Sequence, residues 1–356
     1  MPTQFFKIKT NAKARTDVKV LLIYTGGTLG MVYDAHKKSL VPFDFELVLE
    51  RLPEIQRLDF EIVVTTLRDI VDSSNMQPKL WVEIGRIIYA QYDNFDSFVV
   101  IHGTDTMAYS ASALSFMLEG LNKPVIFTGA QLPIGAARTD AKENLITALE
   151  IAAYRINNQP VVSEVSLFFG STLLRGNRSS KKETSQFAAF RSENYPVLAE
   201  AGVTIEYNTP FIKPYDATTS LTLHERFNDD VVILKLFPGI SEKVMKGVLQ
   251  IEELKGVVLE TFGAGNAPTY SWFLNTLKEA IDRNVLIYNV SQCDGGRVTQ
   301  GYYQTSSWLN KVGVISGSDL TTEAAITKMM FAFGQSDNLA EVRSFLATPI
   351  CGEMSL

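Results

Sequence analysis

Short apolar runs alternate along the chain with longer segments in which apolar residues recur at helical spacing. Runs such as VLLIY, FVVI and VVILKLF are nearly all apolar, which is typical of strands buried on both faces of a parallel sheet. The pattern predicts strands at residues 19–25, 60–65, 97–101, 124–128, 164–169, 231–236, 256–260 and 285–290. It predicts helices between them at residues 80–91, 107–118 and 142–154.

This alternation lapses at residues 207–228, where two prolines and a cluster of threonines interrupt it. Strands that alternate with helices indicate an α/β fold. The chain of 356 residues is long enough for two domains of about 150 residues each. We therefore predict a larger N-terminal parallel-sheet α/β domain at residues 1–206, a linker at 207–228, and a smaller C-terminal α/β domain at 229–356.

Charge and scarce residue types exclude several functions. The 33 basic and 39 acidic residues give a net charge of −6, whereas nucleic-acid binding usually requires a basic surface. Three scattered histidines and two cysteines lack the spacing of a metal site. The absence of a P-loop and of a G-x-G-x-x-G fingerprint disfavours nucleotide cofactors and a dinucleotide-dependent oxidoreductase. From these features we expect a protein without metal or cofactor. We also expect it to be cytoplasmic, because the sequence has neither a membrane-spanning apolar run nor a leader peptide.

Polar loops follow the predicted strands of the N-terminal half. In an open parallel sheet, ligands bind beyond the carboxyl ends of the strands. Hydroxyls, carboxylates and a lysine are therefore expected at one edge of one sheet. The loops are TGGTLG at 25–30, DSSNM at 72–76, HGTDTM at 102–107, GAQ at 129–131 and RGNRSSK at 175–181.

Each loop taken alone also has a structural interpretation. Glycines fit tight turns at strand exits, threonine or aspartate fits a helix N-cap, and serines fit local turns. A strand-end histidine is more often a hydrogen-bonded structural residue than a base, and a lysine pair is usually solvated. The residues open to such interpretations are Gly26, Gly27, Ser73, Ser74, His102, Thr104, Asp105, Lys181 and Lys182.

Taken together, the loops supply nucleophilic chemistry without imidazole. A threonine hydroxyl needs a base to accept its proton, and Thr104, Asp105 and Lys181 supply a relay that leaves Thr28 as the attacking group. Backbone N–H groups of the glycine turn suit an oxyanion. Ser73 with backbone amides suits a carboxylate, and Asp105 suits an ammonium. This set describes acyl transfer from a small zwitterion.

TGGTLG followed by HGTDTM resembles the two signatures of the bacterial-type L-asparaginase family. DSSNM, KPVIFTGAQLP, LFFGSTLLRGNRSSK, FGAGNAP and NVSQC occur in the order expected of its cytoplasmic type I branch, from about residue 18 onward. The resemblance implies cofactor-free hydrolysis of L-asparagine to L-aspartate and ammonia through a covalent acyl-enzyme. It also implies a larger N-terminal and a smaller C-terminal α/β domain, and a homo-oligomer in which two intimate dimers form a tetramer.

The resemblance also implies roles for individual residues, with Thr28 as the nucleophile and Ser73 as the ligand of the substrate α-carboxylate. Catalytic roles are implied for Thr28, Thr104, Asp105, Lys181 and Tyr303. Substrate binding is implied for Ser73, Ser74, Thr104, Asp105 and Asn266, the last near the partner's site. The family's lid usually carries a tyrosine just before a proline, but this chain has Leu40 there. The base that activates Thr28 therefore stays open, with Tyr33 and Tyr303 as candidates.

Two other functions use part of the same set. The amidase subunit of a tRNA-dependent amidotransferase shares these motifs, but it carries an extra N-terminal domain that about 17 residues before the first strand do not supply. A catalytically silent amino-acid-binding module would need Ser73 and Asp105 but not Thr28, Thr104 or Lys181. The preference between asparagine and glutamine stays open, because one methylene in a pocket is worth only about 1–3 kcal/mol.

Overall fold

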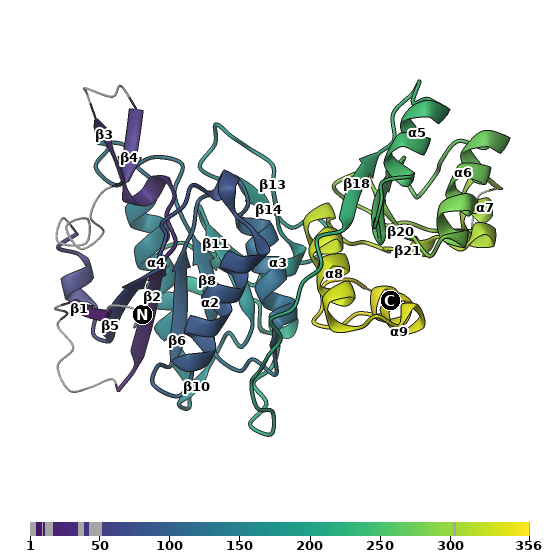
Figure 1. The fold of residues 1–356 in the computed structure, drawn as a ribbon. Coiled ribbons are helices and arrows are strands. Elements are labelled where there is room, and N and C mark those ends of the chain that lie inside the picture. Colours follow the sequence, from purple (N-terminus) through teal and green to yellow (C-terminus); the bar gives the residue numbers. More distant parts are fainter. Residues whose placement is uncertain are drawn as a thin grey trace. The chain divides into compact units, whose positions relative to one another are not determined.

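The computed structural model describes residues 5–8, 10, 17–34, 39–42, 52–301 and 304–355. They form two compact units that divide between Leu223 and His224, within the predicted linker (Figure 1). Much of that segment packs on the first unit: β16 (Ile205–Tyr207) pairs with β15 (Ala199–Ala201), and β17 (Thr222–Leu223) pairs with β7 (Leu118–Glu119). The domain limits at 206 and 229 remain a proposal.

The described residues of the first unit build a nine-stranded sheet in the order β1-β5-β2-β6-β8-β11-β12-β15-β16 (Figure 1). The predicted parallel sheet forms its centre, because the apolar runs are buried on both faces. The parallel strands are β5 (Glu61–Thr66), β2 (Lys19–Tyr24), β6 (Ser97–Ile101), β8 (Val125–Thr128) and β11 (Val165–Phe169). The strands β1 (Phe5–Ile8), β12 (Thr172–Arg175), β15 and β16 add antiparallel edges that the pattern did not predict.

Helices cover both faces of this sheet (Figure 1). The three predicted helices are α2 (Pro78–Ala90), α3 (Met107–Met117) and α4 (Ala141–Ala153). On one face, Leu145 and Leu149 of α4 share a core with Val20 and Leu22 of β2. Because side chains alternate along a strand, the neighbouring β2 residues point to the opposite face, where α2 and α3 pack together.

Short strand pairs complete the first unit. Each forms a local antiparallel ladder outside the large sheet. They are β3 (Met31–Asp34) with β4 (Ser39–Pro42), β9 (Arg155–Ile156) with β10 (Gln159–Pro160), and β13 (Ser180–Lys181) with β14 (Phe190–Arg191).

The second unit confirms the predicted return of strand–helix alternation. Its described strands form a parallel sheet in the order β18-β19-β20-β21. These are β18 (Val231–Lys235), β19 (Gly256–Thr261), β20 (Leu286–Ser291) and β21 (Ile315–Ser316). The helices are α5 (Glu242–Leu249), α6 (Ser271–Asp282), α7 (Gln304–Val312), α8 (Thr322–Gln335) and α9 (Leu339–Ala347).

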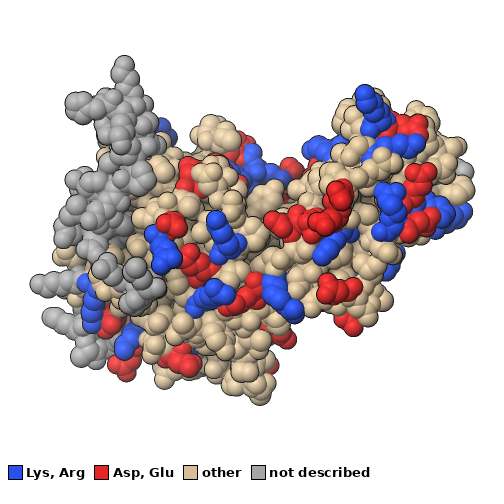
Figure 2. All heavy atoms as spheres, viewed as in Figure 1, with Lys and Arg blue, Asp and Glu red and all other residues tan. Residues whose placement is uncertain are grey.

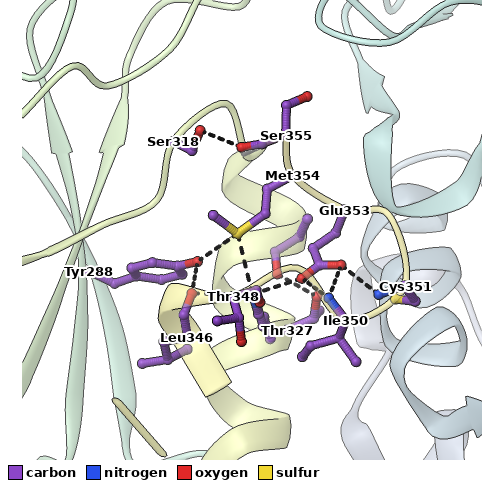
Figure 3. A network of polar contacts seen from close by, with 12 residues as sticks. Tyr288, Ser318, Thr327, Leu346, Thr348, Ile350, Cys351, Glu353, Met354 and Ser355 are labelled. Carbon is purple, nitrogen blue, oxygen red and sulfur yellow. Dashed lines mark hydrogen bonds and ion pairs between the residues drawn. The ribbon is translucent and has the colours of Figure 1, made fainter. Parts of the chain in front are cut away.

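A fully buried ion pair holds the C-terminal segment of the second unit (Figure 3). Lys328 Nζ of α8 lies 2.7 Å from Glu353 Oε1, and neither side chain is exposed. The ammonium also donates to the Thr348 carbonyl oxygen at 2.7 Å, while the carboxylate accepts from the N–H groups of Ile350 and Cys351. Buried charges are tolerated when they are paired and hydrogen-bonded in this way.

Candidate active site

Three predicted polar loops meet beyond the carboxyl ends of β2, β5 and β6. Gly26 and Gly27 adopt φ angles of 124° and 90°, a region that favours glycine. A Cβ on Gly27 would lie 2.6 Å from the Gly103 Cα, and one on Gly103 would lie 2.5 Å from Ser73 Oγ. The backbones approach closely only because these positions lack side chains. Thr28, Ser73 and Thr104 each lie at or next to one of these contacts.

The two threonines of the TGGT turn have different environments. Thr25 is buried, and its hydroxyl donates to the Ile101 carbonyl oxygen at 2.9 Å, which ties the turn to β6. Thr28 is partly exposed and begins a short 3₁₀ turn, Thr28–Gly30. Thr25 is therefore structural, and Thr28 is the threonine of this turn that is accessible for chemistry.

Lys181 joins two of the predicted site residues, Thr104 and Asp105 of the HGTDT loop. Its Nζ donates to Thr104 Oγ1 at 2.7 Å and to Asp105 Oδ1 at 2.7 Å. The Lys181 side chain is 15% exposed and that of Asp105 is 65% exposed. Thr104 is buried. The interpretation of Lys181 as a solvated surface residue is therefore wrong, and the predicted grouping of these three side chains is confirmed in space.

Lys181 reaches this edge by a route that the sequence did not predict. The strand β12 runs antiparallel to β11 and so leads away from the site. The next residues form a 3₁₀ turn, Gly176–Arg178, that packs against α3, and the chain then returns along α3 toward Asp105. Pairing of β13 with β14 fixes the Lys181 backbone. The lysine therefore arrives from a return segment and not from the end of a strand.

Ser73 and Ser74 differ in their availability to a ligand. Ser73 is buried beside Gly103, and its carbonyl oxygen accepts from the Thr106 hydroxyl at 2.7 Å. Ser74 is exposed, and its hydroxyl donates to Asp72 Oδ1 at 2.7 Å. The hydrogen bonds from the Ser74 side chain and backbone lower the pKa of the Asp72 carboxyl. Ser74 thus has the local turn role as well, and substrate binding by either serine stays a prediction.

His102 is structural and not a base. Its Nδ1 lies 2.7 Å from the Gly103 carbonyl oxygen. Because a carbonyl oxygen only accepts hydrogen bonds, Nδ1 carries the proton. Nε2 then accepts from the Ser110 hydroxyl at 2.8 Å, and the hydroxyl oxygen accepts from Trp81 Nε1 at 2.9 Å. Complete burial lowers the pKa of His102 to about 4. The neutral ring thus anchors the HGTDT loop to α2 and α3.

The pKa of His102 predicts a dependence of stability on pH. At pH 5 the unfolded chain binds a proton on this ring, whose ordinary pKa is about 6.5, while the folded chain does not. The contribution is complete above pH 6.5 and falls as the pH drops toward 4, by about 1.4 kcal/mol per unit. From pH 7 to 5 we expect His102 to cost the protein about 2 kcal/mol in the free energy of unfolding.

Urea denaturation at both pH values measures this loss. The matched variant His102→Gln keeps hydrogen-bonding groups but does not titrate. Its free energy of unfolding should be lower at pH 7 and should fall less between pH 7 and 5 than that of the wild type. The same pH dependence in the two proteins would contradict the assignment of a buried, neutral His102.

Some predicted residues are not placed by the structure. Tyr303 lies outside the described residues, and at Tyr33 and Leu40 only the backbone is described. Asn266 lies in the second unit, where Phe262 and Asn266 form a β-bridge. The base that activates Thr28 is therefore still open, and the roles of Tyr303 and Asn266 stay predictions.

The sequence reasoning missed the side chains that hold the 129–131 loop. Gln131 lies 3.4 Å from Thr104 Oγ1 through its Oε1, while Asp140 and Asn144 bind the loop backbone. Gln131 was expected at this edge as part of the GAQ loop but without a role, and no motif indicated Asp140 or Asn144. Among the described residues, no group of three His, Cys, Asp or Glu side chains is arranged to hold a metal, and no described helix is long and apolar enough to cross a membrane.

Comparison with known proteins gives consistent matches across the chain. The family model "Asparaginase, N-terminal" matches residues 19–213, and "Glutaminase/Asparaginase C-terminal domain" matches residues 230–346. L-asparaginase 1 of Escherichia coli (strain K12) is 39% identical over 338 residues, which cover 94% of this chain and 98% of that protein.

Two further relatives bear on fold and function. The crystal structure of L-asparaginase I from Vibrio cholerae O1 biovar eltor str. N16961 matches with a TM-score of 0.86 and 38% identity, covering 96% of this chain and 100% of that one. A glutamyl-tRNA(Gln) amidotransferase subunit of Pyrococcus abyssi (strain GE5 / Orsay) is 33% identical over 347 residues, which cover 95% of this chain and 77% of that protein.

Proposed function

The chain belongs to the asparaginase family, and from this premise we propose that it hydrolyses the side-chain amide of L-asparagine to give L-aspartate and ammonia. The observation that carries the proposal is the position of Lys181 Nζ, 2.7 Å from both Thr104 Oγ1 and Asp105 Oδ1. This group stands beside the glycine turn that presents Thr28. A binding module would have no need of such a relay.

The reaction proceeds by acyl transfer through Thr28. The Thr28 oxygen attacks the side-chain carbonyl carbon of asparagine, the carbon–nitrogen bond breaks, and the nitrogen leaves as ammonia with the proton of the hydroxyl. Water then cleaves the resulting ester, which releases aspartate and restores the Thr28 hydroxyl. Backbone N–H groups of the glycine turn stabilise the oxyanion, and the Lys181–Thr104 pair moves the protons.

The recognition of the substrate follows from its zwitterionic head. We propose that Ser73 and Ser74 bind the α-carboxylate, with backbone amides as further donors, and that the exposed carboxylate of Asp105 binds the α-ammonium. Asn266 and Tyr303 are proposed to serve the site of a second copy of the chain. This proposal includes a cytoplasmic dimer of dimers that requires neither metal nor cofactor.

The alternative function, as the amidase of a tRNA-dependent amidotransferase, is supported less well. The amidotransferase subunit of Pyrococcus abyssi is similar to nearly the whole chain, but a protein that handles tRNA usually has a continuous basic surface. On the face seen in Figure 2, acidic and basic side chains are interspersed, and the net charge of the chain is −6. Free hydrolysis of asparagine is therefore the favoured function.

An ammonia-release assay tests the proposed function. The purified chain, without tRNA or partner, is expected to release ammonia from L-asparagine, and the curves for asparagine and glutamine report its preference. D-asparagine is the matched control, because it carries the same amide on the opposite configuration at Cα. A purified chain that binds L-asparagine but releases no ammonia would support the silent binding module instead.

A further inference from the structure

The hydrogen bonds around Thr104 have a fixed direction. The Lys181 ammonium has only donors, so Thr104 Oγ1 must accept from it across 2.7 Å. The Thr104 hydroxyl lies 3.4 Å from Gln131 Oε1, an amide oxygen that only accepts. The chain of contacts therefore runs from Lys181 to Thr104 to Gln131. The second lone pair of the Thr104 oxygen is left for a proton donor of the reaction.

The amide of Gln131 has only one orientation that satisfies its neighbours. Its Nε2 lies 3.1 Å from the carbonyl oxygen of Gln186 and 3.4 Å from that of Glu183. Carbonyl oxygens need a donor, so the nitrogen faces them and the oxygen faces Thr104. The two carbonyls belong to the segment that follows Lys181. By accepting from Gln131 Nε2 they orient Gln131 Oε1 toward the Thr104 hydroxyl.

The backbone of Gln131 is held by a buried acid. Its N–H donates to Asp140 Oδ2 at 2.9 Å and lies 3.1 Å from Oδ1, which also accepts from the Leu132 N–H at 3.1 Å. Asn144 donates to Asp140 Oδ2 at 3.2 Å and to the Gly129 carbonyl oxygen at 2.9 Å. Asp140 and Asn144 are both buried. Asp140 and Asn144 therefore fix the loop backbone that carries the Gln131 side chain.

We propose that Gln131 is a positioning residue, which acts through Thr104. Its amide oxygen accepts a hydrogen bond from the Thr104 hydroxyl and thereby turns the remaining lone pair of the hydroxyl oxygen toward the reacting groups. This inference rests on the proposed function, because it assigns a role in the same reaction. Gln131 neither receives nor donates a proton in the chemistry. Its loss removes orientation but leaves Thr104 and Lys181 in place.

The variant Gln131→Met tests the proposal, because methionine has a similar length and no polar group. We expect kcat for L-asparagine to fall about tenfold, less than the 10²–10⁴-fold value of an acid–base group itself. KM should stay within about twofold, since the ligands of the carboxylate and ammonium are unchanged. The control Leu132→Met, at the next position of the loop, should keep the kcat of the wild type.

A double-mutant cycle with Thr104→Val separates orientation of Thr104 from support of the 183–186 segment. If Gln131 acts through the Thr104 hydroxyl, the double variant and Thr104→Val release ammonia with the same rate constant. This rate constant is measured in a single turnover with enzyme in excess. A further tenfold loss in the double variant, or a wild-type kcat for Gln131→Met, overturns the proposal. A wild type that releases no ammonia instead overturns the proposed function, so the two failures are distinct.

Discussion

Replacement of Thr28 by alanine is expected to lower the rate of ammonia release from L-asparagine by about 10⁴-fold or more, because the attacking oxygen is lost. Thr28 begins the 3₁₀ turn Thr28–Gly30 and is partly exposed, so the substitution removes little buried surface. The variant should fold normally. It should also still bind L-asparagine, measured by calorimetry, because the proposed ligands Ser73 and Asp105 are unchanged.

Two companion variants make this result specific. Thr28→Ser keeps a hydroxyl at the same position and should retain part of the activity. Thr25→Val removes the other hydroxyl of the turn, whose bond to the Ile101 carbonyl oxygen is 2.9 Å long, and should lower stability rather than remove the chemistry. Activity above a few per cent in Thr28→Ala would show that another residue is the nucleophile.

The contrast between Thr25 and Thr28 shows which features of the site can be predicted from the sequence and which cannot. Strands such as 97–101 were predictable because their residues are nearly all apolar, and every position is buried. The sheet then places the loops at one edge. The order of residues in TGGT, however, does not tell which hydroxyl is buried in the sheet. That depends on a contact with Ile101, 76 residues away, which no local pattern encodes.

The path of the chain that brings Lys181 to the site is a second feature that the sequence did not predict. Because the strand β12 has only four residues, TLLR, its pattern is too short to identify and its antiparallel direction could not be inferred. Lys181 was therefore expected from a strand end, whereas the chain returns along α3 to reach Asp105. The set of residues was predictable from chemistry, but the route was decided by packing. The contact between Gln131 and Thr104 was likewise unpredictable, because it depends on how two loops pack together.

Replacement of Lys181 by methionine is expected to lower kcat by about 10³-fold, within the range for loss of an acid–base group. Methionine matches the length of much of the side chain but cannot donate to Thr104 Oγ1 or Asp105 Oδ1, both 2.7 Å from Nζ in the native protein. Ammonia release under saturating asparagine measures the effect. The neighbouring exposed Lys182 supplies the control, and Lys182→Met should keep the wild-type rate.

Stability should change little in Lys181→Met, and this separates chemistry from structure. The Asp105 side chain is 65% exposed, so its charge stays hydrated without a partner, and the loss should be below about 1 kcal/mol. Denaturant unfolding measures that quantity. A large drop in stability together with the loss of rate would indicate that Lys181 holds the loop. A wild-type kcat would instead show that Lys181 takes no part in the chemistry.

Lys181→Arg then distinguishes the two things a lysine can supply here. An arginine keeps the positive charge and donates hydrogen bonds, but its guanidinium does not give up a proton in proteins. If Lys181 only stabilises negative charge, the arginine variant should recover much of the rate that methionine loses. If the Lys181 amine must accept the Thr104 proton during turnover, arginine should be as inactive as methionine. At rest the Lys181 ammonium only donates to Thr104, so Lys181 can accept a proton during turnover only after it has given one up. A guanidinium does not give up a proton, and we therefore expect the arginine variant to show little recovery.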